Sequence, residues 1–225
     1  MTRAAMILAA GRGERLRPLT DRLPKPLVEA GGETLIGRHV RCLASAGYGR
    51  LVINTAHLGH LIEKALGDGR GWGVDIVYSR EDGTALDTGG GILNALELMG
   101  GGPFPVVNGD IWTDYPFERM ALAPADLAHL VLVPNPDHNT AGDFALAAGR
   151  VTDWVSGEAP GALTFSGIGI YHPDLFQGCE PGIFPLAPLL RDAAARGRVS
   201  GECYAGAWTD VGTVARLEEL RRRVG

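Results

Sequence analysis

The sequence has few of the residues that build disulfide-stabilised or metal-stabilised proteins. Its 225 residues include three cysteines, Cys42, Cys179 and Cys203, which are far apart and odd in number. No Cys-x-x-Cys pair occurs, so neither a disulfide framework nor a zinc site is indicated, and we expect a reducing, cytoplasmic environment. His57 and His60 lie three positions apart but have no third ligand at a suitable spacing, so we interpret them as packed or solvated side chains.

Long apolar runs, repeats and basic excess are also missing. No run reaches the roughly 20 apolar residues of a transmembrane helix, and the run after Arg3 is too short for a signal peptide, so we interpret it as a strand. A net charge of −5 argues against a nucleic-acid partner. Without a linker or a hexapeptide repeat, we predict one domain over 1–225, no C-terminal β-helix, no membrane partner, and a monomer or weak homo-oligomer.

The patterns that are present alternate between strand and helix. In the first half, strands are predicted at 4–10, 50–55, 74–79 and 104–107, and helices at 34–46, 58–66 and 89–99. In the second half, strands are predicted at 128–133, 144–147, 151–155 and 164–171, and helices at 186–196 and 214–224. The first half implies a parallel βαβαβ unit, and the second half is more mixed. We therefore predict an α/β fold, a doubly wound Rossmann-like mixed sheet with helices on both faces.

The most informative stretch runs from Leu8 to Thr20 and continues to Pro24-Lys25-Pro26-Leu27. Gly11 and Gly13 let the backbone approach a phosphate chain closely. Arg15 can donate two parallel hydrogen bonds to a phosphate, and Lys25 adds a compact positive charge. A nucleoside triphosphate is therefore the expected ligand. The alternative is a tight turn with solvated basic residues. The stretch is neither a Walker loop nor Gly-x-Gly-x-x-Gly, which disfavours a hydride-transferring dinucleotide enzyme.

Two aspartates follow predicted strands or apolar stretches. Asp110 ends the segment Val107-Asn108-Gly109-Asp110, and open α/β sheets bind ligands at this edge. Asp210 ends the apolar stretch Ala207-Trp208-Thr209 and precedes a helix. Triphosphate chemistry needs a hard cation held by few carboxylates and by substrate oxygens. We predict that Asp110 and Asp210 hold Mg²⁺; the alternative is a pair of helix-capping aspartates.

Taken together, the glycine-arginine string and Pro-Lys-Pro-Leu resemble the signature of the sugar-1-phosphate nucleotidyltransferases. The resemblance covers nearly the whole chain. It implies that a nucleoside triphosphate and a sugar 1-phosphate react to give a nucleotide-sugar and pyrophosphate, with Mg²⁺ as cofactor. It also implies that Asp110 and Asp210 meet at the metal, and that Arg15, Lys25 and Asp110 are the catalytic residues.

The resemblance also assigns binding residues. The nucleotide is expected to contact Ala9, Ala10, Gly11, Gly13, Arg15, Lys25, Glu81, Asp82, Thr88 and Gly89. Among these, Thr88 and Gly89 are expected to face the base and the two acids its edge, although the segment Leu86–Gly91 is equally compatible with a flexible turn. The candidates for the sugar side are Asn108, Asp143, Ser166 and Gly167. Asp143 and Ser166 have the alternative roles of turn or strand-end residues.

The second half is most similar to a uridylyltransferase branch of this family. The similar segments are 107–115, 128–133, 163–168, 186–191 and 199–202. They imply UTP and N-acetylmuramic acid 1-phosphate as substrates, in cell-wall recycling. One departure is the absence of lysine from 153–159, where many relatives place a sugar-phosphate lysine; Lys25 or the metal must compensate. The alternatives are GTP or dTTP with a hexose or heptose 1-phosphate, and a non-catalytic regulatory module that binds nucleotide-sugars.

Overall fold

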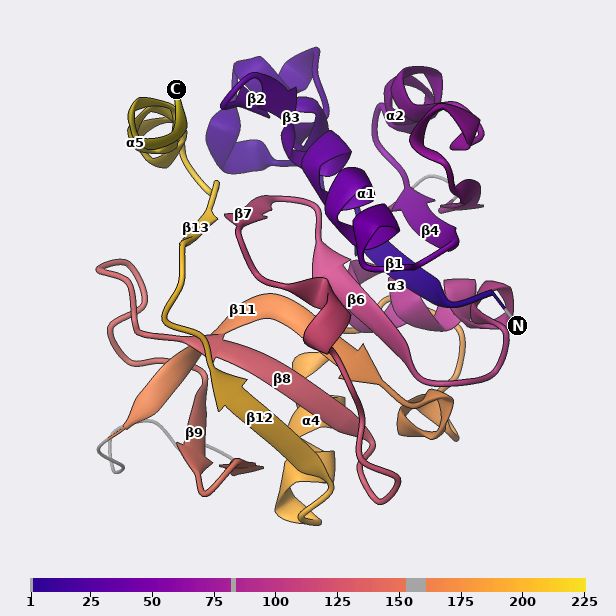
Figure 1. Ribbon diagram of the computed structural model, residues 1–225, viewed down its shortest axis with the longest axis vertical. Coiled ribbons are helices and arrows are strands. Elements are labelled where there is room, and N and C mark those ends of the chain that lie inside the picture. Colours follow the sequence, from indigo (N-terminus) through magenta and orange to yellow (C-terminus); the bar gives the residue numbers. More distant parts are fainter. Residues whose placement is uncertain (1, 82–83, 153–160) are drawn as a thin grey trace.

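The computed structural model describes residues 2–81, 84–152 and 161–225 (Figure 1). Within these residues, a nine-stranded sheet has the order β5-β4-β1-β6-β11-β8-β12-β10-β9. Its strands are β1 (Ala4–Leu8), β4 (Arg50–Thr55), β5 (Asp75–Arg80), β6 (Phe104–Asn108), β8 (Ala128–Val133), β9 (Phe144–Ala147), β10 (Arg150–Thr152), β11 (Ala162–Tyr171) and β12 (Val199–Cys203).

The sheet is parallel in its first half and mixed in its second. Strands β5, β4, β1 and β6 are parallel neighbours, β11 runs antiparallel to β6 and β8, and β12 is parallel to β8. The chain passes from one side of β1 to the other between β5 and β6. Open α/β sheets bind ligands at such a switch point, at the carboxyl ends of the strands. The mixed sheet predicted from the sequence is confirmed.

Helices cover both faces of this sheet, as predicted. They are α1 (Leu35–Ser45), α2 (Gly59–Leu66), α3 (Asp87–Ala95) and α4 (Ala187–Ala195). A fifth helix, α5 (Val214–Val224), packs instead in a separate cluster with Leu16, Val28 and Leu35. Successive residues of a strand point to opposite faces. In β1, Ile7 accordingly packs into the core cluster that contains Ile36 of α1, and Met6 packs into the cluster that contains Ile92 of α3. No helix in the described ranges is long and apolar enough to cross a membrane.

The helix α1 begins at a side-chain cap, whereas α3 begins earlier than the sequence predicts. Thr34 caps α1, because its Oγ1 accepts a hydrogen bond from Gly37 N at 3.0 Å. The helix predicted at 89–99 instead begins at Asp87, and its last turn is the 3₁₀ segment Leu96–Met99. Other 3₁₀ segments are Glu14–Leu16, Leu19–Asp21, Lys25–Leu27, Arg70–Trp72, Phe117–Arg119 and Pro173–Phe176.

Several short strands were not predicted from the sequence. They are β2 (Glu29–Ala30), β3 (Glu33–Thr34), β7 (Ile111–Thr113) and β13 (Trp208–Asp210), besides β12 in the main sheet. Two- and three-residue strands are too short to show an alternating pattern. The strand predicted at 151–155 begins at Arg150, and its residues 153–155 lie outside the described residues.

Candidate active site

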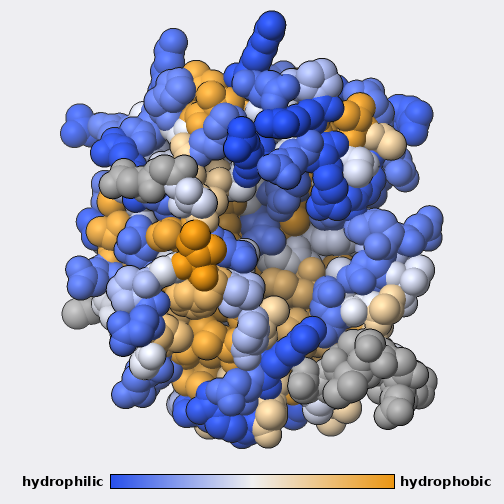
Figure 2. Space-filling view, turned by 180° about the vertical axis from the view of Figure 1, so that it is seen from behind, coloured by the Kyte–Doolittle hydropathy of each residue, from blue (hydrophilic) through white to orange (hydrophobic). Residues whose placement is uncertain are grey.

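A cavity of about 530 Å³ lies at the switch point of the sheet. It gathers most of the residues predicted to bind nucleotide, together with the sugar-side candidate Asn108 and the metal candidate Asp110. The lining residues are Leu8, Ala9, Ala10, Gly11, Gly13, Glu14, Arg15, Lys25, Pro26, Asn54, Ala85, Asp87, Thr88, Asn108, Asp110 and Gly212. Figure 2 shows that the molecule is hollowed near the middle of one face, with hydrophilic residues along the border.

The loop after β1 presents its backbone to this cavity. Gly13 has φ +66°, and a Cβ there would lie 3.0 Å from Thr20 Cγ2 and 3.2 Å from Lys25 Cβ. Thr20 Oγ1 donates to the Gly13 carbonyl oxygen at 2.8 Å and fixes the turn. At Gly11, by contrast, a Cβ would meet no protein atom within 4 Å. The loop therefore leaves open space at Gly11, where a phosphate chain can approach the backbone.

Lys25 and Asp110 form an ion pair at the centre of the cavity. Lys25 Nζ lies 2.5 Å from Asp110 Oδ2, and the two side chains are 9% and 38% exposed. Gly109 allows this approach, because its N–H donates to the Leu8 carbonyl oxygen and a Cβ would lie 2.8 Å from that oxygen. The ammonium group is thus held at the carboxyl ends of β1 and β6, with its counter-ion facing the cavity.

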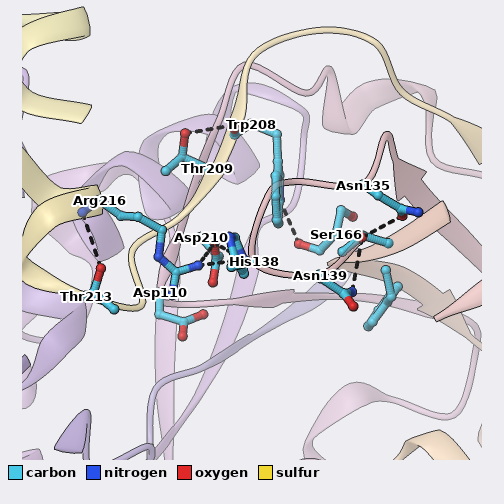
Figure 3. A network of polar contacts seen from close by, with 12 residues as sticks. Asp110, Asn135, His138, Asn139, Ser166, Trp208, Thr209, Asp210, Thr213 and Arg216 are labelled. Carbon is cyan, nitrogen blue, oxygen red and sulfur yellow. Dashed lines mark hydrogen bonds and ion pairs between the residues drawn. The ribbon is translucent and has the colours of Figure 1, made fainter. Parts of the chain in front are cut away.

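Asp210 is brought beside Asp110 by a ribbon of two strands. β13 pairs antiparallel with β7, with Asp210 opposite Ile111, and Val211 N donates to the Asp110 carbonyl oxygen at 2.8 Å. Figure 3 shows Asp110 and Asp210 near each other, with Arg216 and His138 beside Asp210. The side chain of Asp210 is therefore paired with basic groups, as Asp110 is paired with Lys25.

The two aspartates fit the chemistry of Mg²⁺. This ion takes oxygen ligands, retains water and is typically bound through one or two carboxylates plus substrate phosphates. The described residues contain no group of three or more His, Cys, Asp or Glu that could hold a metal by themselves. A site built from Asp110 and Asp210 therefore needs oxygens from a substrate to complete it.

On the expected sugar side, Asn108 and Gly167 lie against each other. Gly167 has φ +79°, and a Cβ there would lie 2.7 Å from Asn108 Nδ2. Ser166 is 1% exposed, and its Oγ donates to the Val131 carbonyl oxygen at 2.6 Å. The sequence analysis expected Ser166 to contact the sugar, but its hydroxyl is used inside the irregular segment of β11. Its carbonyl oxygen accepts from Trp208 Nε1 at 2.9 Å and orients that ring.

Asp143 belongs to a hydrogen-bonded loop at the end of β8. Its Oδ2 accepts from Phe165 N at 2.8 Å and its Oδ1 accepts from Asn139 Nδ2 at 3.2 Å. Thr164 Oγ1 donates to Asn135 Oδ1 at 2.9 Å, and Figure 3 shows this network beside Ser166. Asp143 therefore positions the loop, and both of its oxygens are occupied by partners inside the fold.

The comparisons agree with this geometry. Residues 4–147 match the model of the nucleotidyl transferase family. The chain belongs to this family. An N-acetylmuramate alpha-1-phosphate uridylyltransferase of Neisseria meningitidis is 51% identical over 228 residues, which cover 98% of each chain. One of the same name from Caulobacter vibrioides is 38% identical and covers 92% of this chain. The resemblance seen in the sequence is confirmed.

Other nucleotidyl transferases share less of the chain or only its fold. A mannose-1-phosphate guanylyltransferase of Mycobacterium tuberculosis is 34% identical over 56% of this chain and 32% of its own length. A putative glucose-1-phosphate thymidylyltransferase from Bacillus anthracis superposes over the whole chain with a TM-score of 0.85 at 21% identity. A UDP-glucose pyrophosphorylase, solved with UDP-glucose, has a TM-score of 0.77 at 22% identity. These structures confirm the fold class.

Glu81 was expected at the edge of the base, but it lies behind the cavity wall. It is 5% exposed, and its Oε1 accepts from Asn54 Nδ2 at 2.7 Å. Its Oε2 accepts from Leu86 N at 2.7 Å, and Asn54 Oδ1 accepts from Ala9 N at 2.7 Å. Glu81 therefore ties the ends of β1 and β4 to the start of α3. The other acid expected there, Asp82, lies outside the described residues.

The glycines that open α3 serve packing rather than an open anion site. The N–H groups of Gly89 and Gly90 both donate to the Phe184 carbonyl oxygen, at 3.0 and 3.1 Å. A Cβ at Gly89 would lie 2.5 Å from the Phe184 ring. Thr88 lines the cavity, while its Oγ1 accepts from Leu186 N at 2.9 Å. Of this segment, Asp87 and Thr88 line the cavity, and Thr88 is the predicted base contact that remains available to a nucleotide.

A substitution at Gly90 tests this packing. A Cβ there would lie 2.1 Å from the backbone oxygen of Gly182, so Gly90→Ala should separate α3 from the segment 182–184 and destabilise the protein by about 1–3 kcal/mol. Gly71→Ala is the matched control, because a Cβ at Gly71 has open space. Urea unfolding measures both variants. Equal free energies of unfolding would contradict the packing role.

A second cavity, of about 680 Å³, adjoins the first at Arg15. It contains Trp208 and Arg216, for which no functional role was predicted from the sequence, and His138 of the polar segment 137–143. Arg216 follows Thr213, whose Oγ1 accepts from Arg216 N at 3.3 Å and caps α5. This Gly-Thr-x-x-Arg string directly continues the segment that contains Asp210, and it was the available signal. His138 offered no signal for its place beside Asp210, because it is a lone histidine in a turn-rich segment.

Proposed function

We propose that this protein joins UTP to N-acetylmuramic acid 1-phosphate, giving UDP-N-acetylmuramic acid and pyrophosphate. The observation that carries the proposal is the full-length match to two uridylyltransferases that act on this sugar phosphate, one of them 51% identical. Similarity to the mannose-1-phosphate guanylyltransferase of Mycobacterium tuberculosis covers only 56% of the chain. UTP is therefore better supported than GTP, and the product belongs to cell-wall recycling.

The geometry supports a transfer that proceeds by positioning and charge stabilisation. A phosphate oxygen of the sugar 1-phosphate attacks the α-phosphorus of UTP in line, a new P–O bond forms, and the bond to the β-phosphate oxygen breaks. Pyrophosphate leaves, and no covalent enzyme intermediate is needed. The loop at Gly11 and Gly13 cradles the phosphates, and the exposed Arg15 holds the outer ones. Lys25 neutralises charge between the α-phosphate and the incoming phosphate.

Asp110 and Asp210 are the residues that would hold Mg²⁺. Bound there, the ion supplies charge neutralisation to the phosphates. The protein's own part is to hold Asp110 in the turn before β7 and Asp210 on the neighbouring strand β13, with Lys25 paired to Asp110 and Arg216 paired to Asp210. The sequence has no lysine at 153–159 to contact the sugar phosphate, and Lys25 would take over that contact.

A regulatory module without turnover is the weaker alternative. Such a module has no need of a nearly buried lysine paired with a strand-end aspartate, and this chain has both. The three cysteines form no disulfide, which supports our inference of a cytoplasmic protein. The monomeric or weakly oligomeric state, and the single domain over 1–225, stay predictions; size-exclusion chromatography with light scattering tests the first.

The proposal predicts a ranking of substrates. N-acetylmuramic acid 1-phosphate with UTP should give the highest kcat/KM among four nucleoside triphosphates and a panel of sugar 1-phosphates, measured by pyrophosphate release. N-acetylglucosamine 1-phosphate lacks the lactyl group, and one missing charged hydrogen bond costs roughly 1–3 kcal/mol, so it should be clearly poorer. Equal or better use of mannose 1-phosphate with GTP would overturn the uridylyltransferase assignment.

The loop that would border the lactyl group is held in place by hydrogen bonds to β11. The segment Asp137–Asp143 is polar and rich in turns, a composition that suits a flexible rim. Instead, Asn135 Nδ2 donates to the Ala162 carbonyl oxygen at 2.9 Å, and Asn139 Nδ2 donates to Thr164 Oγ1 at 3.1 Å. Discrimination between the two sugars must therefore come from shape and contacts, since this loop is anchored at both of these points.

A further inference from the structure

Asp210 is paired with Arg216, and His138 lies beside both of these side chains. Arg216 Nη1 donates a hydrogen bond to Asp210 Oδ1, and His138 Nε2 lies 3.1 Å from the same oxygen. The side chains of Arg216 and Asp210 are only 16% and 24% exposed, so salt screens this pair weakly. In the substrate-free protein, the carboxylate therefore already has a counter-ion (Figure 3).

Several contacts hold the guanidinium of Arg216 beside Asp210. With Nε2 unprotonated, His138 accepts a hydrogen bond from Arg216 Nη1 at 2.6 Å. A Cβ at Gly212 would collide with Arg216 Nη2, so the guanidinium lies directly over that backbone. Gly212 also lines the cavity of Lys25 and Asp110. Arg216 thus stands at the boundary between the two cavities.

Both carboxylates that fit Mg²⁺ are therefore neutralised by cations of the chain itself. A bare divalent ion entering this site meets two carboxylates, but also the charges of Lys25 and Arg216. The net attraction of the ion to the site is small, because the nearby positive charges of Lys25 and Arg216 repel it. A triphosphate changes this balance, since its oxygens supply negative charge and further ligands.

We propose that Arg216 is the counter-ion that makes metal binding depend on the nucleotide. It occupies Asp210 in the substrate-free protein and releases this carboxylate when a metal–triphosphate complex enters. Phosphate oxygens at the boundary of the two cavities then offer the guanidinium a replacement anion. The choice of a triphosphate rests on the proposed function, whereas the restraint on Asp210 rests on the contacts of Arg216.

The test is a titration with Mn²⁺, followed by electron paramagnetic resonance of the free ion, without nucleotide. Arg216→Gln should bind Mn²⁺ about tenfold more tightly than the unmodified protein, because one positive charge beside Asp210 no longer repels the ion. With UTP present, this advantage should disappear. Arg216→Lys keeps the charge and should bind Mn²⁺ weakly. Arg223→Gln is the matched control, since Arg223 lines the same cavity but bonds to Thr209 Oγ1.

A double variant shows whether the gain acts through Asp210. In Asp210→Asn combined with Arg216→Gln, the tighter binding should be lost. Unchanged Mn²⁺ affinity in Arg216→Gln, or a gain that survives in the double variant, overturns the proposal. If Arg216→Gln does not fold, Arg216→Met, which also removes the charge, replaces it, and unchanged affinity there also overturns the proposal. Uridylyl transfer is measured separately, so its absence would refute the proposed function and leave the Mn²⁺ result intact.

Discussion

Asp110→Asn should lower the turnover number by on the order of a hundredfold or more, the loss expected when one electrostatic stabiliser is removed. The substitution keeps the size of the side chain and removes the charge that pairs with Lys25 and fits a metal ion. Its second expected effect is a loss of stability. Lys25, whose side chain is 9% exposed, would keep its charge without a partner. Because Asp110 is 38% exposed, the loss should stay below the roughly 3–5 kcal/mol of a fully buried pair.

Pyrophosphate release and thermal unfolding measure the two effects. Asp114→Asn is a suitable control, because it makes the same chemical change in the loop after β7 and an asparagine can still accept the hydrogen bond from Tyr204. An Asp110→Asn enzyme with near-normal turnover would refute the assignment. Full activity of the unmodified enzyme in excess EDTA would refute the metal dependence.

The strand-end aspartate could be predicted because its signal is local. A run of apolar residues ending in Asn-Gly-Asp predicts a buried strand with an acid at its carboxyl end, and the fold class tells where such ends meet. The helix predicted at 34–46 could be recognised for the same reason. Each depends on residues that are neighbours in the sequence.

The approach of Asp210 to Asp110 could not be predicted from local sequence. β13 and β7 are short strands that come from distant parts of the chain, and their pairing places Asp210 beside Asp110. Neither segment has enough residues to show a period. Only the family resemblance implied that the two acids meet. The Gly-Thr-x-x-Arg string after Asp210 was a local signal for Arg216, but it did not indicate that Arg216 would pair with Asp210.

The misassigned contacts have a common physical cause. Glu81 and Ser166 are polar residues at or near strand ends, a pattern that suits both a ligand contact and an internal hydrogen bond. In the structure, Glu81 accepts hydrogen bonds from Asn54 Nδ2 and Leu86 N, and Ser166 Oγ donates one to the Val131 carbonyl oxygen. Buried polar groups must find partners, and here the partners come from elsewhere in the fold. A single sequence does not distinguish the two cases.

Lys25→Met should abolish most of the turnover and leave the fold nearly as stable as before. Methionine has a similar length and no charge, so the nearly buried side chain loses a group that is costly to desolvate. Asp110 loses its partner, but water can solvate its carboxylate, which is 38% exposed. The thermal unfolding midpoint of Lys25→Met should therefore lie above that of Asp110→Asn, although both variants break the same ion pair.

The kinetic signature of Lys25→Met should also be distinctive. The charge that Lys25 meets grows as the new P–O bond forms, so kcat should fall by about 10²–10³ while KM for UTP changes less. Arg15→Ala should do the reverse and mainly raise KM for UTP, because Arg15 is exposed and serves the outer phosphates. Steady-state kinetics with UTP varied at saturating sugar 1-phosphate separate the two. A Lys25→Met enzyme that altered only KM for UTP would show that Lys25 binds the ground state and does not stabilise the transition state.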